Sequence, residues 1–322
     1  MSKVRKKIIL ISGDPNSINT EIIYKTWKKL NLSIRKKIFV IGNYNLLKDQ
    51  FRQLKYPIKL KKIENINEKN NSNHLKIIDI KIKYNSPFNV KKKHISKYVL
   101  NSLNLGHKLA LSKDVAGLIN CPVNKNIFNK KNIGVTEYLA SKCKIKDKSE
   151  VMLINNEKLS VCPITTHLDI KNVSKNIKSK LILIKIKTIQ KWYFKFFKKK
   201  PKFGILGLNP HNAELKFNSE EKNEIIPAIT KLKKQNYDVA GPLVSDTIFI
   251  KDFKNYNILI GMYHDQVLSP FKAIFGFNAI NITMGLKYLR VSPDHGIAVD
   301  LIKKNKANPL SLLQCVKFVN KF

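Results

Sequence analysis

The chain has 322 residues, 43% of them hydrophobic, and a formal net charge of +39 at pH 7. This length suits about two domains with a substantial core, and no apolar stretch approaches the roughly 20 residues of a membrane span. Only four of the 61 basic residues are arginines, and lysines are spread along the chain beside abundant Asn and Ile. Such scattering is typical of a coding bias and disfavours a nucleic-acid-binding protein, whose basic residues gather in patches. The positive field itself suits a phosphorylated small molecule as well as it suits RNA.

The N-terminal part predicts a strand, a loop and a helix in turn. Residues 7–12 are an apolar run typical of a buried strand, and a helix is expected from about Thr20. The loop between them contains only Gly13, so it lacks the glycine fingerprint of a dinucleotide-binding turn. The basic start leads into a strand rather than a signal-peptide core, and we therefore expect a cytoplasmic protein.

Further along the chain, residues 114–120 predict a second buried strand and residues 136–142 a helix. Residues 173–200 predict one long amphipathic helix that ends before Pro201. Another helix is expected after Ser219, which suits an N-cap position. The four cysteines have no CxxC spacing, so we expect neither disulfides nor a cysteine metal site.

Four polar clusters follow directly or closely after apolar, β-rich runs, and each contains one of the seven histidines. The clusters are residues 165–167, 209–211, 263–266 and 292–295, and the runs are residues 159–164, 203–208, 258–262 and 279–284. In an open α/β sheet, ligands bind beyond the carboxyl ends of the strands. The pattern therefore predicts an α/β enzyme whose chemistry uses imidazole.

These clusters belong to a longer ordered set of motifs. The set comprises Gly13-Asp14-Pro15, Pro122-Val123-Asn124-Lys125, Gly134-Val135-Thr136-Glu137, Thr165-Thr166-His167, Gly207-Leu208-Asn209-Pro210-His211, Gly241-Pro242 with Ser245-Asp246-Thr247, Met262-Tyr263-His264-Asp265-Gln266, and Asn281-Ile282-Thr283 through Arg290 to Asp294-His295-Gly296. In this set the chain resembles the 4-hydroxythreonine-4-phosphate dehydrogenase (PdxA) family over nearly its full length. The resemblance implies an NAD-dependent homodimer with the two-domain α/β fold of the isocitrate and isopropylmalate dehydrogenases.

The implied domains are discontinuous. Residues 1–130 and 271–322 form the first α/β domain, and residues 131–270 form the second. The active site is expected in the cleft between the domains, at the dimer interface. NAD, or alternatively NADP, is the expected cofactor, and the residues that bind it are not identified by the sequence.

The resemblance makes His167, His211 and His264 the ligands of a divalent metal. Neutral imidazoles suit Zn, Co, Ni or Fe better than Mg, and three ligands leave positions open for substrate oxygens. The spacing alone does not indicate a metal, because a histidine at a strand end is more often a hydrogen-bonded structural residue. His295 is expected to be structural or to support the site.

The resemblance also supplies residues that contact substrate: Thr136, Lys272, Asn281 and Arg290. Because nearly all basic residues of this chain are lysines, the arginine at position 290 indicates a need for the planar guanidinium group, which binds phosphate or carboxylate through two hydrogen bonds. The alternative for Arg290 is an ordinary surface ion pair. Asp246 is the candidate for proton transfer or for support of the site, and a helix cap is its alternative role.

The implied reaction oxidises 4-phosphohydroxy-L-threonine to a 3-oxo acid, which loses CO2 to give 3-amino-2-oxopropyl phosphate in pyridoxal phosphate biosynthesis. Several positions depart from the family pattern: Val135 stands where a histidine is usual, Ser17 and Asn19 stand where glycines are common, and Asn212-Ala213 replaces Ala-Gly. These departures leave open a dehydrogenase of another phosphorylated hydroxy acid, such as threonate or erythronate 4-phosphate. A basic nucleic-acid-binding protein on an enzyme-like fold is the alternative from another class.

Overall fold

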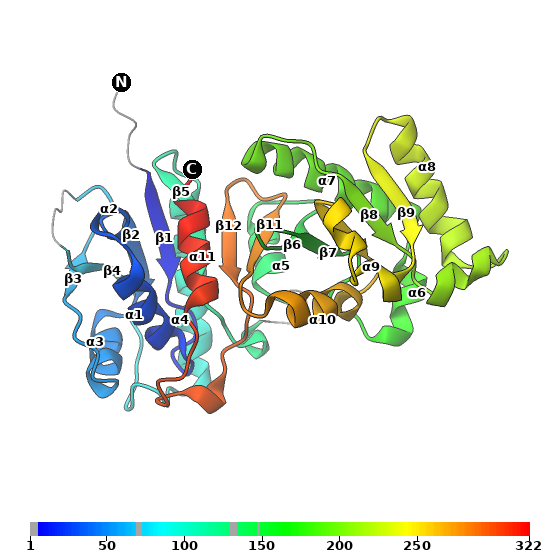
Figure 1. Ribbon diagram of the computed structural model, residues 1–322. Coiled ribbons are helices and arrows are strands. Elements are labelled where there is room, and N and C mark those ends of the chain that lie inside the picture. Colours follow the sequence, from blue (N-terminus) through cyan, green and yellow to red (C-terminus); the bar gives the residue numbers. More distant parts are fainter. Residues whose placement is uncertain (1–5, 69–72, 129–133, 147–148) are drawn as a thin grey trace, which may run out of the picture. The chain divides into compact units, whose positions relative to one another are not determined.

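The computed structural model describes residues 6–68, 73–128, 134–146 and 149–322, and the chain divides into two compact α/β units (Figure 1). Unit 1 comprises Met1–Cys143 and Leu286–Phe322, and unit 2 comprises Lys144–Gly285. These limits differ from the domain limits expected at residues 130 and 270, the first of which lies outside the described residues. Helix α5 (Val135–Lys142) belongs with unit 1, where the hydroxyl of Tyr138 donates to Asn104 Oδ1 at 2.8 Å. The domain limits expected from the sequence stay a prediction.

The described residues of unit 1 form six strands, each parallel to its neighbours within the unit. Their order is β3 (Leu60–Ile63), β4 (Leu75–Asp79), β2 (Ile38–Gly42), β1 (Lys7–Ile11), β5 (Val115–Asn120) and β12 (Arg290–Pro293). The apolar residues of β1 are fully buried, as expected for a parallel strand covered on both faces. The strands predicted at residues 7–12 and 114–120 are thus confirmed.

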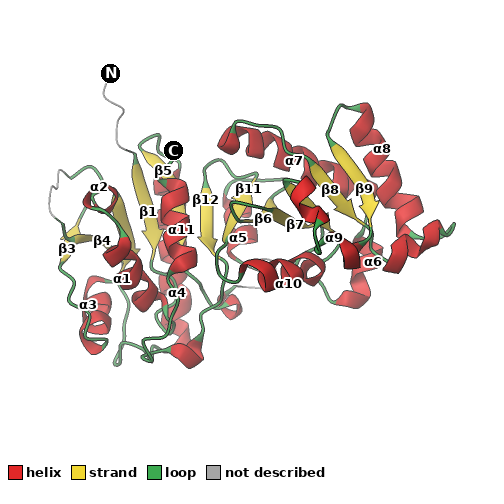
Figure 2. Ribbon diagram, in the orientation of Figure 1, coloured by secondary structure: helices red, strands yellow, loops and turns green. Residues whose placement is uncertain are grey.

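Helices cover the strands of unit 1 (Figure 2). They are α1 (Asn19–Lys29), α2 (Leu32–Arg35), α3 (Tyr44–Gln53), α4 (Lys92–Ala110), α5 and α11 (Leu310–Val319), with the short turns η1 (Lys125–Ile127) and η6 (Val299–Leu301). Helix α4 buries Tyr98, Val99 and Leu103 against β1 and β5. The C-terminal helix α11 packs against β5 and β12, so the two ends of the chain complete one core.

In unit 2, the residues outside the gap at 147–148 form six strands in a mixed arrangement. Their order is β11 (Ile280–Met284), β6 (Val151–Asn155), β7 (Ser160–Pro163), β10 (Ile258–Gly261), β8 (Phe203–Leu206) and β9 (Val239–Leu243). Strand β6 is antiparallel to both neighbours, whereas β7, β10, β8 and β9 are parallel. All four apolar runs that precede or lie near the histidine clusters therefore form strands, at β7, β8, β10 and β11.

The remaining elements of unit 2 are helical: η2 (Ile170–Asn172), α6 (Val173–Asn176), α7 (Ser179–Phe197), η3 (Pro210–Leu215), η4 (Glu221–Ile225), α8 (Ile226–Lys234), α9 (Ser245–Ile248), η5 (Asp252–Asn255) and α10 (His264–Phe275). The single helix predicted over residues 173–200 is wrong. The chain leaves the helical conformation at Ile177 and Lys178 and starts again at Ser179, whose backbone N–H donates to Glu224 Oε2 at 2.7 Å. This carboxylate satisfies a donor at the start of α7 from 45 residues away in the sequence.

The helix predicted after Ser219 is present, and its first turn is a π-helical turn, η4. Ser219 lies just before it, and its Oγ accepts a hydrogen bond from the backbone N–H of Lys222 at 3.3 Å. The four cysteines are buried and free of disulfides. Within the described residues, no helix is long and apolar enough to cross a lipid bilayer.

Candidate functional site

The three histidines singled out as metal ligands all follow strands that lie side by side in unit 2. His167 comes after β7, His264 is the first residue of α10 after β10, and His211 lies in η3 after β8. Because β7, β10 and β8 are consecutive parallel strands, their carboxyl ends share one edge. This is the edge at which open α/β sheets bind ligands.

Hydrogen bonds tie these loops together, and Gln266 contributes to them through both ends of its amide. Its Oε1 accepts from the backbone N–H of Met262 at 2.6 Å, and its Nε2 donates to the carbonyl of Gly207 and to Ser245 Oγ, both at 2.7 Å. The Thr165 hydroxyl donates to the carbonyl of Met262 at 2.7 Å. The loops after β7, β8, β9 and β10 are therefore fixed to one another. Sequence reasoning quoted Gln266 only as part of a motif and assigned it no role.

The imidazoles of His167 and His264 face one another, with ring centroids 6.1 Å apart and ring planes inclined by 35°. Two imidazoles that share one zinc place their centroids about 5 Å apart, so this pair would have to close by roughly 1 Å. His264 Nδ1 lies 2.6 Å from Asp265 Oδ1, an arrangement that orients the ring and directs Nε2 away from the carboxylate. The chemical type of these donors, imidazole nitrogen, thus suits zinc and similar divalent metals.

The full set of three ligands is not assembled in the described residues. No three His, Cys, Asp or Glu side chains there are grouped closely enough to hold a metal ion. His211 is exposed and lies in a left-handed turn, with φ of 48°. His167 also has a positive φ, of 55°. Non-glycine residues in this region are strained, and such strain is concentrated at functional sites.

Three other predicted residues lie in unit 2. Asp246 is exposed in the first turn of α9, and no side chain caps this helix, so the alternative role of Asp246 as a cap is wrong. Lys272 is half-buried in α10. Asn281 lies in β11, and its Oδ1 is buried without a hydrogen-bond partner among the described residues. Since buried polar atoms are nearly always paired, this oxygen is a candidate for binding a ligand.

Arg290 and Thr136 come together in unit 1. Arg290 is only 3% exposed; its Nε donates to Asn120 Oδ1 at 2.7 Å, and its Nη1 donates to Thr136 Oγ1 at 3.3 Å. Burial lowers the pKa of Arg290 to about 10, which leaves the guanidinium charged at neutral pH. The alternative of a surface ion pair is therefore wrong. The bonds to Asn120 and Thr136 fix the plane of a buried cation.

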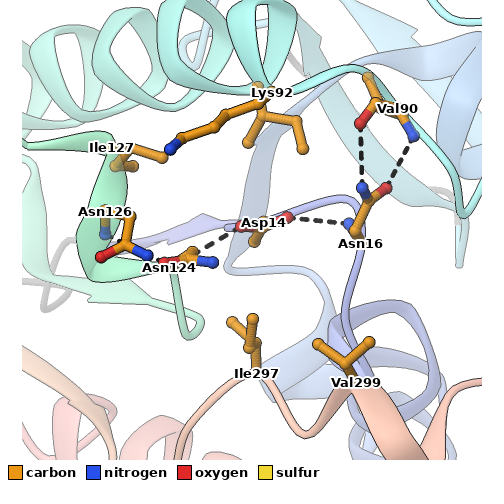
Figure 3. A pocket seen from close by; sticks show the side chains of 10 residues that line it. Asp14, Asn16, Val90, Lys92, Asn124, Asn126, Ile127, Ile297 and Val299 are labelled. Atoms are coloured by element: carbon orange, nitrogen blue, oxygen red, sulfur yellow. Dashed lines mark hydrogen bonds between the residues drawn. The ribbon is translucent and has the colours of Figure 1, made fainter.

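Unit 1 also contains a pocket of about 380 Å³ at the ends of β1 and β5, which sequence reasoning did not find (Figure 3). Residues that follow the two strands, the start of α4 and the surrounding loops and short turns line it: Asp14, Asn16, Val90, Lys92, Ile95, Asn124, Asn126, Ile127, Ile297 and Val299. The strand order reverses here, because β2 and β5 lie on opposite sides of β1. Such a switch point is the usual ligand crevice of an open parallel sheet.

The polar wall of this pocket is ordered by its own hydrogen bonds. The Asp14 carboxylate lies between Asn16 and Asn124 and accepts from their backbone N–H groups at 2.9 and 3.3 Å (Figure 3). Burial raises the pKa of Asp14, and these two bonds oppose the rise. The side chain of Asn16 exchanges two hydrogen bonds with the backbone of Val90. In the sequence, Gly13 was the available sign of this pocket. Its φ of 77° and its packing against the carbonyl of Pro122 leave no room for a side chain, so the turn beside the pocket requires glycine.

Comparison with known proteins places the chain in a family. Residues 34–319 match the family model described as pyridoxal phosphate biosynthetic protein PdxA. The chain is 33% identical over 321 residues to the 4-hydroxythreonine-4-phosphate dehydrogenase of Sulfurihydrogenibium sp. (strain YO3AOP1), covering 97% of this chain and 96% of that protein.

Solved structures agree with this placement. The fold matches the crystal structure of 4-hydroxythreonine-4-phosphate dehydrogenase from Klebsiella pneumoniae with a TM-score of 0.84 and 27% identity, over 98% of each chain. It also resembles isocitrate dehydrogenase from Methylococcus capsulatus in fold, with a TM-score of 0.52 and 12% identity over 98% of this chain and 85% of that one. The chain therefore belongs to the PdxA family of pyridoxal phosphate biosynthetic proteins and is an oxidoreductase.

Proposed function

We propose that this protein oxidises 4-phosphohydroxy-L-threonine with NAD, in the pathway to pyridoxal phosphate. The observation that carries the proposal is the full-length similarity to proteins named 4-hydroxythreonine-4-phosphate dehydrogenase. The product is a 3-oxo acid, which loses CO2 to give 3-amino-2-oxopropyl phosphate. Hydride leaves the carbon of the secondary alcohol for the nicotinamide, and the hydroxyl proton leaves to a base.

The chain's own residues supply binding and proton transfer. The buried guanidinium of Arg290, oriented by Asn120 and Thr136, binds an anionic group of the substrate. Lys272 adds a second cation, and the unpaired Oδ1 of Asn281 accepts a hydrogen bond from a substrate donor. Asp246 takes the proton of the alcohol, since its carboxylate is exposed in the first turn of α9, where the preceding Ser245 Oγ accepts a hydrogen bond from Gln266.

We propose His167, His211 and His264 as the residues that would hold a divalent metal such as Zn or Co. The three imidazoles stand at neighbouring strand ends, and the Asp265 carboxylate already orients His264. A metal bound there would polarise the substrate's hydroxyl and carbonyl oxygens. Activity that is lost with a chelator and restored by one metal would support this assignment, and activity unchanged by chelation would contradict it.

A homodimer is part of the proposal. Since the described part of one chain does not gather three ligands, a second copy would complete the set. The test mixes the His167→Ala and His211→Ala variants after separate purification and subunit exchange. With His167 and His264 of one subunit and His211 of the other in each site, partial recovery of activity in the mixture is expected, because one of the two sites then keeps all its ligands. Two variants that stay inactive when mixed, under conditions where wild-type subunits exchange, would exclude a site that combines His167 of one subunit with His211 of the other.

The pocket beside Asp14 is the proposed place of the dinucleotide. A ribose offers hydroxyl donors to the Asp14 carboxylate, and the apolar walls suit a flat ring. The same carboxylate would repel a 2′-phosphate, which favours NAD over NADP. Lys92, at the start of the 19-residue helix α4, gives the pocket a cation beside a helix N-terminus, and both suit the pyrophosphate.

The decisive experiment follows NADH absorbance with a panel of phosphorylated hydroxy acids, with and without chelator. Turnover of 4-phosphohydroxy-L-threonine at least tenfold faster than that of the other acids is expected. Preference for threonate or erythronate 4-phosphate would replace the proposed substrate, as the buried Val135 in place of the usual histidine allows. No NADH formation with any of these acids would contradict the proposal. The cytoplasmic location expected from the sequence stays a prediction.

A further inference from the structure

We propose that Glu221 is a positioning residue that holds the loop carrying His211, an inference that rests on the proposed function of His211 as a metal ligand. Glu221 is fully buried, at 0% exposure, and is the first residue of the π-helical turn η4. It lies ten residues beyond His211 in the chain. Single π turns inside helices are frequent at functional sites.

The carboxylate of Glu221 is bound entirely by N–H donors of the loop after β8. Its Oε1 accepts from the backbone N–H groups of Leu208 and Asn209, both at 2.8 Å, and its Oε2 accepts from Asn209 Nδ2 at 3.0 Å. Among the described residues, no lysine or arginine forms an ion pair with it, although the chain has 61 basic residues. A buried charge that has no counterion depends on its hydrogen bonds. The loop and the carboxylate therefore stabilise each other.

The segment that follows is strained. His211, Asn212, Ala213, Glu214 and Leu215 have φ of 48°, 57°, 51°, 49° and 57°, so five successive non-glycine residues are left-handed. L-residues visit this region as single positions rather than in runs. Such a run persists only where its surroundings enforce it. On its N-terminal side it is anchored by the Glu221 bonds, and beyond His211 it is anchored by Asn212 Nδ2, which donates to the carbonyl of Pro242 at 3.1 Å.

His211 lies between these two anchors, two residues after Asn209 and one before Asn212. Gly207 leaves room for the side chains of both anchors, because a Cβ there would lie 2.0 Å from Asn212 Oδ1 and 3.1 Å from Glu221 Oε1. The backbone on both sides of His211 is thus fixed, and the direction of its imidazole is limited by the remaining side-chain rotation. Removing the Glu221 contact would free one side, so the left-handed run could relax and move the ring.

The test measures zinc binding rather than activity alone. Glu221→Gln keeps one oxygen for the two backbone N–H groups and places an amide opposite Asn209 Nδ2, where two donors then face each other. The matched control is Glu224→Gln, which neutralises a carboxylate in the same turn that binds Ser179 and not the loop. Calorimetric titration of metal-free full-length protein with Zn²⁺ gives the affinity, and hydrogen exchange of residues 207–215 reports the loop without any metal.

Glu221→Gln should weaken zinc binding by about 10- to 100-fold and speed hydrogen exchange in residues 207–215. Its midpoint of thermal unfolding should stay close to that of the control. The control should change neither zinc binding nor hydrogen exchange. Adding Ala213→Gly and Glu214→Gly, which leaves the Asn212 anchor in place, should restore part of the zinc affinity, because glycines adopt the left-handed run without strain. A merely structural role would not be rescued in this way. If Glu221→Gln does not fold, Asn209→Ala removes one contact to the same carboxylate, together with a contact to Glu220 Oε2, and should shift both readouts in the same direction; Glu220→Gln is then the control for the second contact.

Wild-type zinc affinity in a folded Glu221→Gln variant would overturn the positioning role and leave the metal site standing. If the wild-type protein binds no zinc, the metal site itself fails and the positioning role fails with it. Faster exchange in the variant would then show only that Glu221 orders the loop.

Discussion

Arg290→Lys tests whether the shape of the guanidinium, rather than its charge, is what the site requires. In the structure, Nε of Arg290 donates to Asn120 and Nη1 donates to Thr136, and the side chain is almost completely buried. A lysine ammonium is a point donor and cannot satisfy both partners while also facing a substrate anion in two directions. The charge survives in this variant, and the geometry is lost.

The expected magnitude follows from the bond that is lost. One hydrogen bond to a charged group is worth about 1.5–3 kcal/mol, and about 1.4 kcal/mol corresponds to a factor of ten. We therefore expect kcat/KM to fall by roughly ten- to a hundredfold. Asn120 Oδ1 also loses its donor in a buried place, which costs stability by about 1–3 kcal/mol, so the thermal midpoint must be measured in parallel.

The assay is kcat/KM for the phosphorylated substrate, from NADH absorbance at low and high salt. The loss should persist at high salt, because steering by a chain of net charge +39 barely changes when one cation replaces another. Arg52→Lys is the matched control, since Arg52 is largely exposed in an ion pair with Asp49. A folded Arg290→Lys protein with wild-type kcat/KM at every salt concentration would refute the reasoning.

Three further outcomes are expected. His211→Ala should lose most of its bound metal and nearly all dehydrogenase activity. His107→Ala is the control: it removes a contact of 2.9 Å to the Tyr288 hydroxyl in unit 1 and should keep both the metal and the activity. Metal analysis of the purified proteins tests this. Ile297→Trp should fill the proposed cofactor pocket and raise KM for NAD at least tenfold without raising KM for the phosphorylated acid, and equal effects on both would place the dinucleotide elsewhere. Burial lowers the pKa of Lys76 from 10.5 to about 8, so the unfolded chain binds more protons between these values and stability rises with pH there. We expect Lys76→Met to have a higher free energy of unfolding than wild type at pH 8, and this difference should shrink by about 3 kcal/mol between pH 8 and pH 10.5. Denaturant unfolding of both proteins at the two pH values measures it, and a difference that does not change with pH would contradict the shifted pKa.

The strands and the polar ends of the strands could be predicted because their signals are local. A run such as residues 258–262 is apolar enough to be buried on both faces wherever it lies in the sheet, and a polar residue directly after it must sit at the sheet edge. The histidines after β7, β8 and β10 were located in this way. The family motifs then supplied roles that spacing alone does not contain.

Tertiary structure decided what depends on distant partners. The segment 173–200, predicted as one helix, is interrupted where the Glu224 carboxylate accepts a hydrogen bond from the backbone N–H of Ser179. These residues are 45 positions apart, so no local sequence pattern predicts the contact. The order β7-β10-β8, which brings three histidine loops to adjacent positions, is likewise a property of strand pairing. The burial of two charged side chains also depends on distant partners. Arg290 is hydrogen-bonded to Asn120, and Glu221 is hydrogen-bonded to the loop after β8. Hydropathy marks both as surface residues, and only the hydrogen bonds formed on folding make their burial tolerable.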